Sequence, residues 1–180
     1  SVPKVGLKTV FRQAAESRII TSAHEIITGK VPSFANTRQD NCFFITQNDP
    51  ESCLETIVDL VARRLPGKYG FNPLSDIQVL SPMHKGILGT ESLNAALQKQ
   101  LNKSSKRIIR GQYNFCVGDK VMQIRNNYEM GVFNGDIGRI VNITEDSELQ
   151  VDIDGNILNY GSKELDELIL AYCISIHKSQ

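Results

Sequence analysis

The chain has 180 residues, of which 41% are hydrophobic, so it is long and apolar enough for one domain with a real core. Its 20 basic and 20 acidic residues give a formal net charge of zero, which argues against a nucleic-acid binder that works through net charge alone. No run of about 18 apolar residues occurs and residues 1–4 lack the apolar stretch of a signal peptide, so we expect neither a transmembrane helix nor a membrane partner.

The first part of the chain alternates helix-like and strand-like segments. The predicted elements are a helix at 9–29, a strand at 42–45, a helix at 49–65 ended by Pro66-Gly67, a strand at 77–80 and a helix at 90–101. The helices are predicted from apolar residues at helical spacing, and the short strands from apolar runs. This alternation predicts an α/β fold in which helices flank a parallel sheet.

From Gly118 onward, short strand-like pieces alternate with turn signals. They are expected at 120–124, 138–144, 149–153 and 157–160. Asp154-Gly155 between two such pieces is a good hairpin signal. We therefore predict a small antiparallel β-barrel at 118–164, inserted into an α/β domain formed by 1–117 and 165–180, with the apolar run 168–174 as the last strand of that domain.

The four cysteines are too far apart for a Cys-x-x-Cys pair, and we expect small core residues instead of a zinc site or a disulfide framework. The three histidines fit no metal-ligand spacing either, so no metal site is predicted. This cysteine usage is typical of a reducing compartment, and we expect a cytoplasmic protein.

Charge is unevenly distributed along the second half of the chain. Residues 103–139 hold seven basic and three acidic side chains, whereas residues 140–167 hold eight acidic ones and a single lysine, Lys163. The first stretch could face phosphates and the second could not. An ordinary mixed surface is the alternative interpretation.

Arg12 lies near the start of the first predicted helix, in the string Val-Phe-Arg-Gln-Ala. The helix dipole disfavours a cation at this end. A guanidinium offers a planar fork of donors that suits phosphate oxygens, so Arg12 is a candidate ligand contact. A solvated helix arginine is the alternative.

The loop at 81–86, Ser-Pro-Met-His-Lys-Gly, follows the second predicted strand. It therefore lies at the carboxyl edge of the sheet, where open α/β sheets bind ligands. Ser81, His84 and Lys85 can donate to phosphates, and Gly86 permits a close backbone approach. An ordinary strand-to-helix loop is the alternative.

The string Arg-Asn-Asn-Tyr at 125–128 places a guanidinium, two amides and a ring in four residues, which could pair with a phosphate and stack on a base. The segment Asn-Gly-Asp at 134–136 is better explained as turn chemistry. Phe133 beside it is predicted to be a core residue.

The chain closes with Ser-Ile-His-Lys-Ser-Gln at 175–180, directly after the apolar run. On an extended strand, Ser175 and His177 would point to the same side. His177 has no partner spacing for a catalytic triad, and a DNA-contacting role suits this polar cluster better. Because the string stops inside what looks like a longer motif, we expect the chain to be a fragment.

Five strings in one order carry a resemblance. They are Val-Phe-Arg-Gln, Val-Leu-Ser-Pro-Met, Gly-Asp-Lys-Val-Met-Gln, Asn-Gly-Asp-Ile-Gly and Ser-Ile-His-Lys-Ser-Gln. Together they resemble RecD-like superfamily 1 DNA helicases, the family of the exodeoxyribonuclease V alpha subunit, from about residue 9 to residue 180. The resemblance implies the second RecA-like motor domain of a P-loop NTPase-type motor, with an inserted barrel of the Src-homology-3 (SH3) kind. It also implies an ATP-dependent 5′–3′ helicase that acts in DNA recombination and repair.

The resemblance also implies site residues. Arg12 would be catalytic, reaching the γ-phosphate of ATP, with Gln13 beside it. The DNA-binding residues would be Ser81, Pro82, Met83, His84, Lys85, Gly86, Asn126, Asn127, Ser175, His177, Lys178, Ser179 and Gln180. No Gly-x-x-x-x-Gly-Lys-Ser/Thr string occurs, so ATP and Mg²⁺ would be bound mainly by a first motor domain of the intact parent. We expect the fragment alone to carry no cofactor and to be inactive.

The implied partners are single-stranded DNA and the N-terminal motor domain of the same parent. Whether further exodeoxyribonuclease V subunits also bind is left open. Two other functions stay possible: a nucleic-acid-binding module without a motor role, and a protein-docking domain that uses the barrel.

Overall fold

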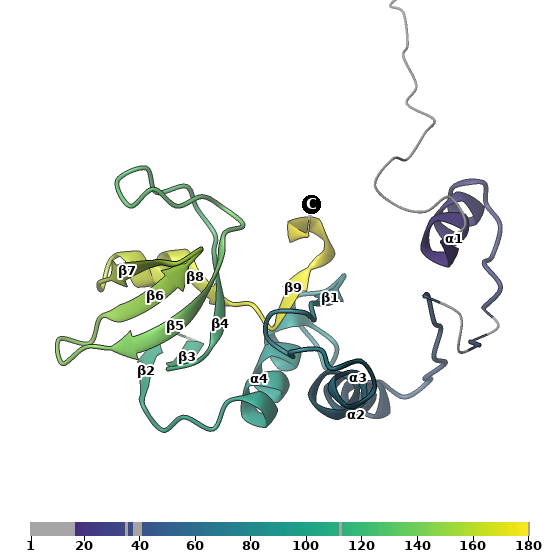
Figure 1. The fold of residues 1–180 in the computed structure, drawn as a ribbon, viewed down its shortest axis with the longest axis horizontal. Helices are drawn as coiled ribbons and strands as arrows, with labels where there is room; N and C mark the ends of the chain where they lie inside the picture. Colours follow the sequence, from purple (N-terminus) through teal and green to yellow (C-terminus); the bar gives the residue numbers. More distant parts are fainter. Residues whose placement is uncertain (1–16, 35, 38–40, 112, 180) are drawn as a thin grey trace, which may run out of the picture. The chain divides into compact units, whose positions relative to one another are not determined.

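The computed structural model describes residues 17–34, 36–37, 41–111 and 113–179. It divides the chain into two units, Ser1–Gln47 and Asn48–Gln180, which are described separately below (Figure 1). Among the described helices, none is both long enough and apolar enough to span a membrane.

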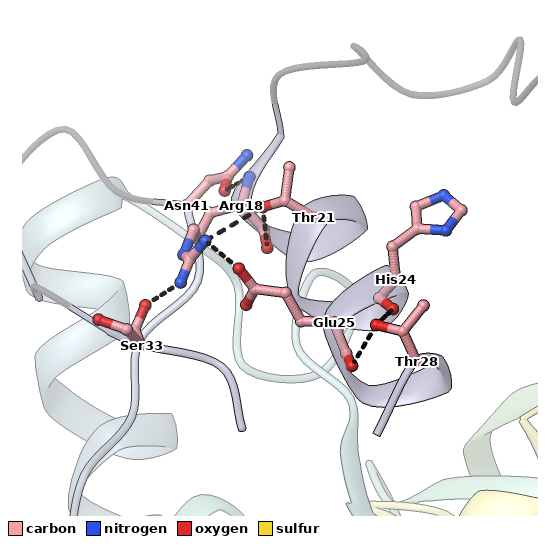
Figure 2. A network of polar contacts seen from close by, with 7 residues as sticks. All are labelled: Arg18, Thr21, His24, Glu25, Thr28, Ser33 and Asn41. Atoms are coloured by element: carbon pink, nitrogen blue, oxygen red, sulfur yellow. Dashed lines mark hydrogen bonds and ion pairs between the residues drawn. The ribbon is translucent and has the colours of Figure 1, made fainter. Parts of the chain in front are cut away.

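In the first unit, α1 (Arg18–Ile27) confirms part of the helix predicted at 9–29. Its last turn is closed by Thr28, whose Oγ1 donates to the carbonyl oxygens of His24 and Glu25, each at 2.9 Å. The Arg18 guanidinium lies 3.5 Å from the Glu25 carboxylate and donates to the carbonyl oxygen of Ser33. Figure 2 shows this cluster, in which the Arg18 backbone N–H also donates to Asn41.

The strand predicted at 42–45 is wrong in this structure, since no strand is assigned there. The Asn36 side chain instead takes the place of a partner strand: its Nδ2 donates to the Phe44 carbonyl at 2.8 Å, and its Oδ1 accepts from the Phe44 N–H at 2.9 Å. Apolar composition alone predicted the strand, but a strand also needs a neighbour for its backbone groups.

The second unit begins with α2 (Pro50–Asp59), a π-helical turn η1 (Leu60–Arg64) and α3 (Leu65–Tyr69). Asp49 caps the start, as predicted, by accepting from the Ser52 N–H at 2.8 Å. The predicted end at Pro66-Gly67 is wrong. Pro66 lies in the first turn of α3, and the wider π turn before it accommodates the missing N–H, so the helix continues to Gly70 at φ +74°.

Two short strands, β1 (Val79–Ser81) and β9 (Cys173–Ser175), pair in parallel, with Ser81 opposite Ser175. Helix α4 (Thr90–Leu101) packs on them and has the predicted bounds. Asn94 of α4 fixes this packing because its side chain donates to the Cys173 carbonyl at 2.8 Å and accepts from the Cys173 N–H at 2.9 Å. The predicted parallel arrangement is thus present as a two-stranded sheet.

The largest sheet is antiparallel, in the order β7-β6-β5-β4-β8 (Figure 1). Its strands are β4 (Lys120–Gln123), β5 (Ile137–Ile143), β6 (Leu149–Ile153), β7 (Asn156–Tyr160) and β8 (Leu168–Leu170). The four strand-like pieces predicted after Gly118 are therefore confirmed. Among the described residues, the two edge strands of this sheet, β7 and β8, do not pair with each other.

A separate hairpin, β2 (Arg107–Arg110) with β3 (Tyr113–Cys116), was missed by the sequence analysis. The apolar run 168–174, predicted as one strand, divides between two sheets. Its first part, β8, pairs with β4, and its last part, β9, pairs with β1. A continuous apolar run has no period that could reveal such a break. The predicted domain division at residues 118 and 164 stays a prediction.

Buried Asp119 joins these parts. Its Oδ1 accepts from Asn102 Nδ2 at 2.6 Å and from the Tyr172 hydroxyl at 2.8 Å. Its Oδ2 accepts from Gln98 Nε2 at 2.6 Å and from the Cys116 N–H at 2.7 Å. One carboxylate thus connects α4, the end of β3 and the link between β8 and β9.

Candidate nucleic-acid interface

A cavity of about 660 Å³ lies in the second unit beside α4 and the carboxyl end of β9. Its lining includes His84, Ser175 and Lys178, which come from two of the segments predicted to bind DNA. These segments meet because β1 and β9 are parallel neighbours, so the segments that follow the two strands leave the sheet at the same edge. The rest of the lining is formed by Thr90, Glu91, Asn94, Ala95, Gln98, Tyr113, Asn114, Ile124, Ile169, Leu170, Cys173 and Ile174.

The loop at 82–86 is fixed at the start of α4 while its side chains stay exposed. The first N–H groups of the helix donate to loop carbonyls, Thr90 to Met83 at 2.9 Å and Glu91 to His84 at 3.3 Å. Gly89 makes this close approach possible, because a Cβ there would lie 2.5 Å from the His84 carbonyl oxygen. Predicted residues of this loop are therefore presented to solvent on a rigid base.

Ser81 has a different role from the predicted one. It is buried, its Oγ donates to the Leu88 carbonyl at 2.6 Å, and it accepts from the Met83 N–H at 3.2 Å. Its hydroxyl holds the loop in shape. Lys85 is exposed, Met83 is 48% exposed, and Gly86 has a left-handed backbone at φ +88°.

The closing segment is not an extended strand after Ser175, because Ile176–Lys178 form a 3₁₀ turn, η3. The prediction that Ser175 and His177 share a strand face is therefore wrong. Ser175 is buried in the cavity wall, whereas His177 is exposed. Ser179 closes the turn through its Oγ, which donates to the Ile176 carbonyl at 2.7 Å.

Asn126 and Asn127 do not line the cavity. Asn127 Nδ2 donates to Glu167 Oε2 at 3.1 Å, and Asn126 Oδ1 accepts from the Asn134 N–H at 2.9 Å. Both amides therefore hold the loop between β4 and β5. That loop is linked to the closing segment, because Lys178 Nζ donates to Asn134 Oδ1 at 3.1 Å.

Phe133 was predicted to be in the core, but its side chain is 48% exposed, while its neighbour Val132 is buried. Adjacent residues of an extended segment point to opposite sides, and the sequence does not say that only the side of Val132 is covered. Arg12, Gln13 and Gln180 lie outside the described residues.

The cavity contains one thiol, Cys173, and burial raises its pKa to about 11, so it stays protonated at neutral pH. Within the described part of the chain, no three His, Cys, Asp or Glu side chains are grouped to hold a metal ion. Lys178 lines the cavity and Lys85 is exposed next to His84, which is chemistry for binding an anion, although the Glu91 carboxylate also belongs to the lining.

Comparisons with known proteins show which proteins this chain is similar to. The family model described as the SH3 domain of ATP-dependent RecD-like DNA helicases matches residues 93–153. The ATP-dependent RecD2 DNA helicase of Deinococcus radiodurans is 34% identical over 182 residues, covering 100% of this chain and 24% of that protein. The RecBCD enzyme subunit RecD of Buchnera aphidicola subsp. Acyrthosiphon pisum is 29% identical, covering 94% of this chain and 31% of that protein.

The structure is also similar to that of the Pif1 helicase from Bacteroides in complex with ADP-AlF3 and single-stranded DNA. The TM-score is 0.55 at 20% identity, over 98% of this chain and 43% of that one. The chain thus shares its mixed helix and sheet fold with this structure. More narrowly, the chain is RecD-like along its whole length, which confirms the resemblance predicted from its strings. It spans about a quarter of the length of the Deinococcus relative.

Proposed function

We propose that this chain is part of an ATP-dependent 5′–3′ DNA helicase of the RecD type, acting in DNA recombination and repair in the cytoplasm. The observation that carries the proposal is the meeting of the 82–86 loop and the 175–179 segment at one cavity. Both segments belong to strings that resemble this family. The RecD-like relatives, described as an ATP-dependent DNA helicase and as a RecBCD subunit, support it.

In this proposal, β1, β9 and their helices belong to the second RecA-like motor domain, at 1–117 and 165–180. The antiparallel sheet belongs to an SH3-like barrel inserted at 118–164. The match of the SH3 family model, at 93–153, supports the second assignment. Pairing of β8 with β4 suggests that the barrel also uses residues beyond 164.

Each side chain at the interface has a role that follows from its chemistry. Lys85, His177 and Lys178 would contact phosphates, and Met83 would pack against a base or a ribose. Ser81 would act indirectly by shaping the loop. Because contacts to the phosphate backbone dominate, binding would be tolerant of DNA sequence.

The ATP site would be shared with another part of a longer protein. This sequence has no P-loop string to cradle a triphosphate, so the residues present do not by themselves fit ATP and Mg²⁺. The contribution of this chain would be Arg12, placed across the cleft to stabilise charge on the transferring phosphoryl group, with Gln13 beside it. The first motor domain of the same protein would be the partner that completes the site. Other exodeoxyribonuclease V subunits would be further partners if the parent protein acts in a multi-subunit exonuclease.

The test is the salt dependence of single-strand binding. Lys85→Ala should weaken binding and lower the slope of log affinity against log salt concentration by about 0.7, the value for one lost phosphate contact on a single strand, and His177→Ala should weaken binding. Lys163→Ala, an exposed lysine in the acidic stretch, is the matched control and should leave the slope unchanged. Slopes that are equal in all four proteins, wild type included, would rule out this interface.

A further inference from the structure

The loop between β4 and β5 carries two exposed aromatic rings in contact with each other. Tyr128 is 78% exposed and Phe133 is 48% exposed. Their ring centroids are 6.0 Å apart, with an interplanar angle of 80°, which is an edge-to-face arrangement. In Figure 1 the loop extends beyond the end of the antiparallel sheet. Exposed rings on such a loop offer an apolar surface to a partner.

The loop is held from beneath by buried polar groups. Gln123, which is 0% exposed, donates to Glu167 Oε2 at 2.8 Å and to the Arg125 carbonyl at 3.0 Å, and accepts from the Tyr160 hydroxyl at 3.0 Å. Glu167 also accepts from Asn127, the residue before Tyr128. The start of the loop is therefore fixed to β7 and to the segment before β8.

The other end of the loop is fixed as well. The Phe133 N–H donates to Asp136 Oδ2 at 2.8 Å, and the Asp136 N–H donates to the Phe133 carbonyl at 3.0 Å. Val132 is buried and forms a β-bridge with Asn127. Because both rings stand on an ordered backbone, a partner would bind them with little ordering cost.

The loop that carries the rings is hydrogen-bonded to a cation of the candidate interface. Asn134, next to Phe133, accepts from Lys178 Nζ at 3.1 Å, and Lys178 lines the cavity with His84. Arg125, at the start of the same loop, is exposed. Proteins that bind single-stranded nucleic acid combine aromatic rings, which stack on bases, with nearby cations, which contact phosphates.

We propose that Tyr128 and Phe133 form a stacking platform for a base of single-stranded DNA that continues from the Lys178 end of the cavity. This inference rests on the proposed function and adds a base-contacting site to it. Asn126, Asn127 and Asn134 are engaged in holding the loop, so the platform would stack on any base without reading its edge.

The experiment uses the full-length protein and a fluorescently labelled oligodeoxynucleotide, with affinity measured by anisotropy. Tyr128→Ala and Phe133→Ala should each weaken binding about fivefold or more, the lower range for loss of one base stack. Their salt slope should stay that of the wild type, because no phosphate contact is lost. Tyr128→Phe keeps the ring and should bind as the wild type does.

A second oligodeoxynucleotide, which contains abasic sites, separates the loss of base stacking from other causes of weaker binding. The wild type should bind the abasic strand more weakly than the intact one, and this difference should be smaller in the two alanine variants. Wild-type affinity in both alanine variants, or an equal loss on intact and abasic strands, would overturn the platform, the second because a loss that needs no base cannot come from stacking. Weakened binding by Lys85→Ala and His177→Ala in the same assay would keep the proposed function even if the platform failed.

Discussion

Single buried residues join the elements of the second unit, and Asp119 is the clearest case. Its carboxylate is completely buried and accepts four hydrogen bonds, from three side chains and one backbone N–H. Burial together with the Asp119 charge raises the pKa of the Tyr172 hydroxyl far above its ordinary value of 10.0, so Tyr172 stays a donor. A buried charge is stable here because all its acceptor positions are used.

We predict that Asp119→Asn lowers the free energy of unfolding by about 3 kcal/mol, because an amide N–H₂ would then face donors in the interior. Tyr172→Phe removes only one of the four hydrogen bonds and should cost about 1 kcal/mol. Urea unfolding of the chain and both variants measures the difference. Equal losses in the two variants would show that the charge of Asp119 contributes nothing beyond a single hydrogen bond.

At the same scale, two of the segments predicted to bind DNA meet at one cavity, and the roles of their residues stay predictions. His84 and Lys178 line one cavity, and Lys85 and His177 are exposed near it in the chain. Ser81, by contrast, is a buried loop-shaping residue. Residue type and spacing indicate chemistry, but whether a polar group serves a ligand or its own loop depends on contacts that only the fold creates.

At the scale of elements, regular periodicity made prediction possible. Helix α4 was predicted with its bounds because apolar residues recur at helical spacing, and β6 because its alternation is regular. The hairpin β2–β3 was missed because neither strand has a clear alternation. The break between β8 and β9 was missed because it depends on which partner strand is adjacent, which is a long-range property.

The buried hydroxyl of Tyr160, at the end of β7, predicts that the stability of the fold decreases at alkaline pH. Burial, then the nearby charges of Glu167 and Asp136, raise the pKa of Tyr160 to about 12 from an ordinary 10.0. Since the folded state holds this proton more tightly, the stabilisation is complete below pH 10 and is lost as the pH rises through 12. Tyr172 and Cys173, whose pKa values are also raised by burial, act in the same direction.

Urea midpoints measured from about pH 8 to about pH 11.5 test this. Tyr160→Phe should be less stable than the wild type at neutral pH, because it loses the hydrogen bond to Gln123, but should lose less stability over the alkaline range. Parallel curves for the two proteins would contradict a role for Tyr160 ionisation.

At the scale of the whole molecule, two segments far apart in the sequence meet at one cavity, and a loop with two exposed aromatic rings is hydrogen-bonded to one of them. The 82–86 loop and the 175–179 segment meet because parallel strands carry them to one edge. The β4–β5 loop joins them through Lys178 and Asn134. The likeness to RecD-like helicases runs over the whole chain, and the proposed function places this arrangement within a longer protein.

The measurement that tests that account most directly is ATP hydrolysis by the full-length protein, with and without single-stranded DNA, in the wild type and in Arg12→Ala. We predict that single-stranded DNA stimulates hydrolysis by the wild type. Arg12→Ala should abolish hydrolysis while its affinity for single-stranded DNA stays within a few-fold of the wild type, since the arginine would act on the phosphoryl group and not on DNA. Hydrolysis that DNA does not stimulate, or unchanged turnover in Arg12→Ala, would contradict the assignment of this chain to a DNA motor.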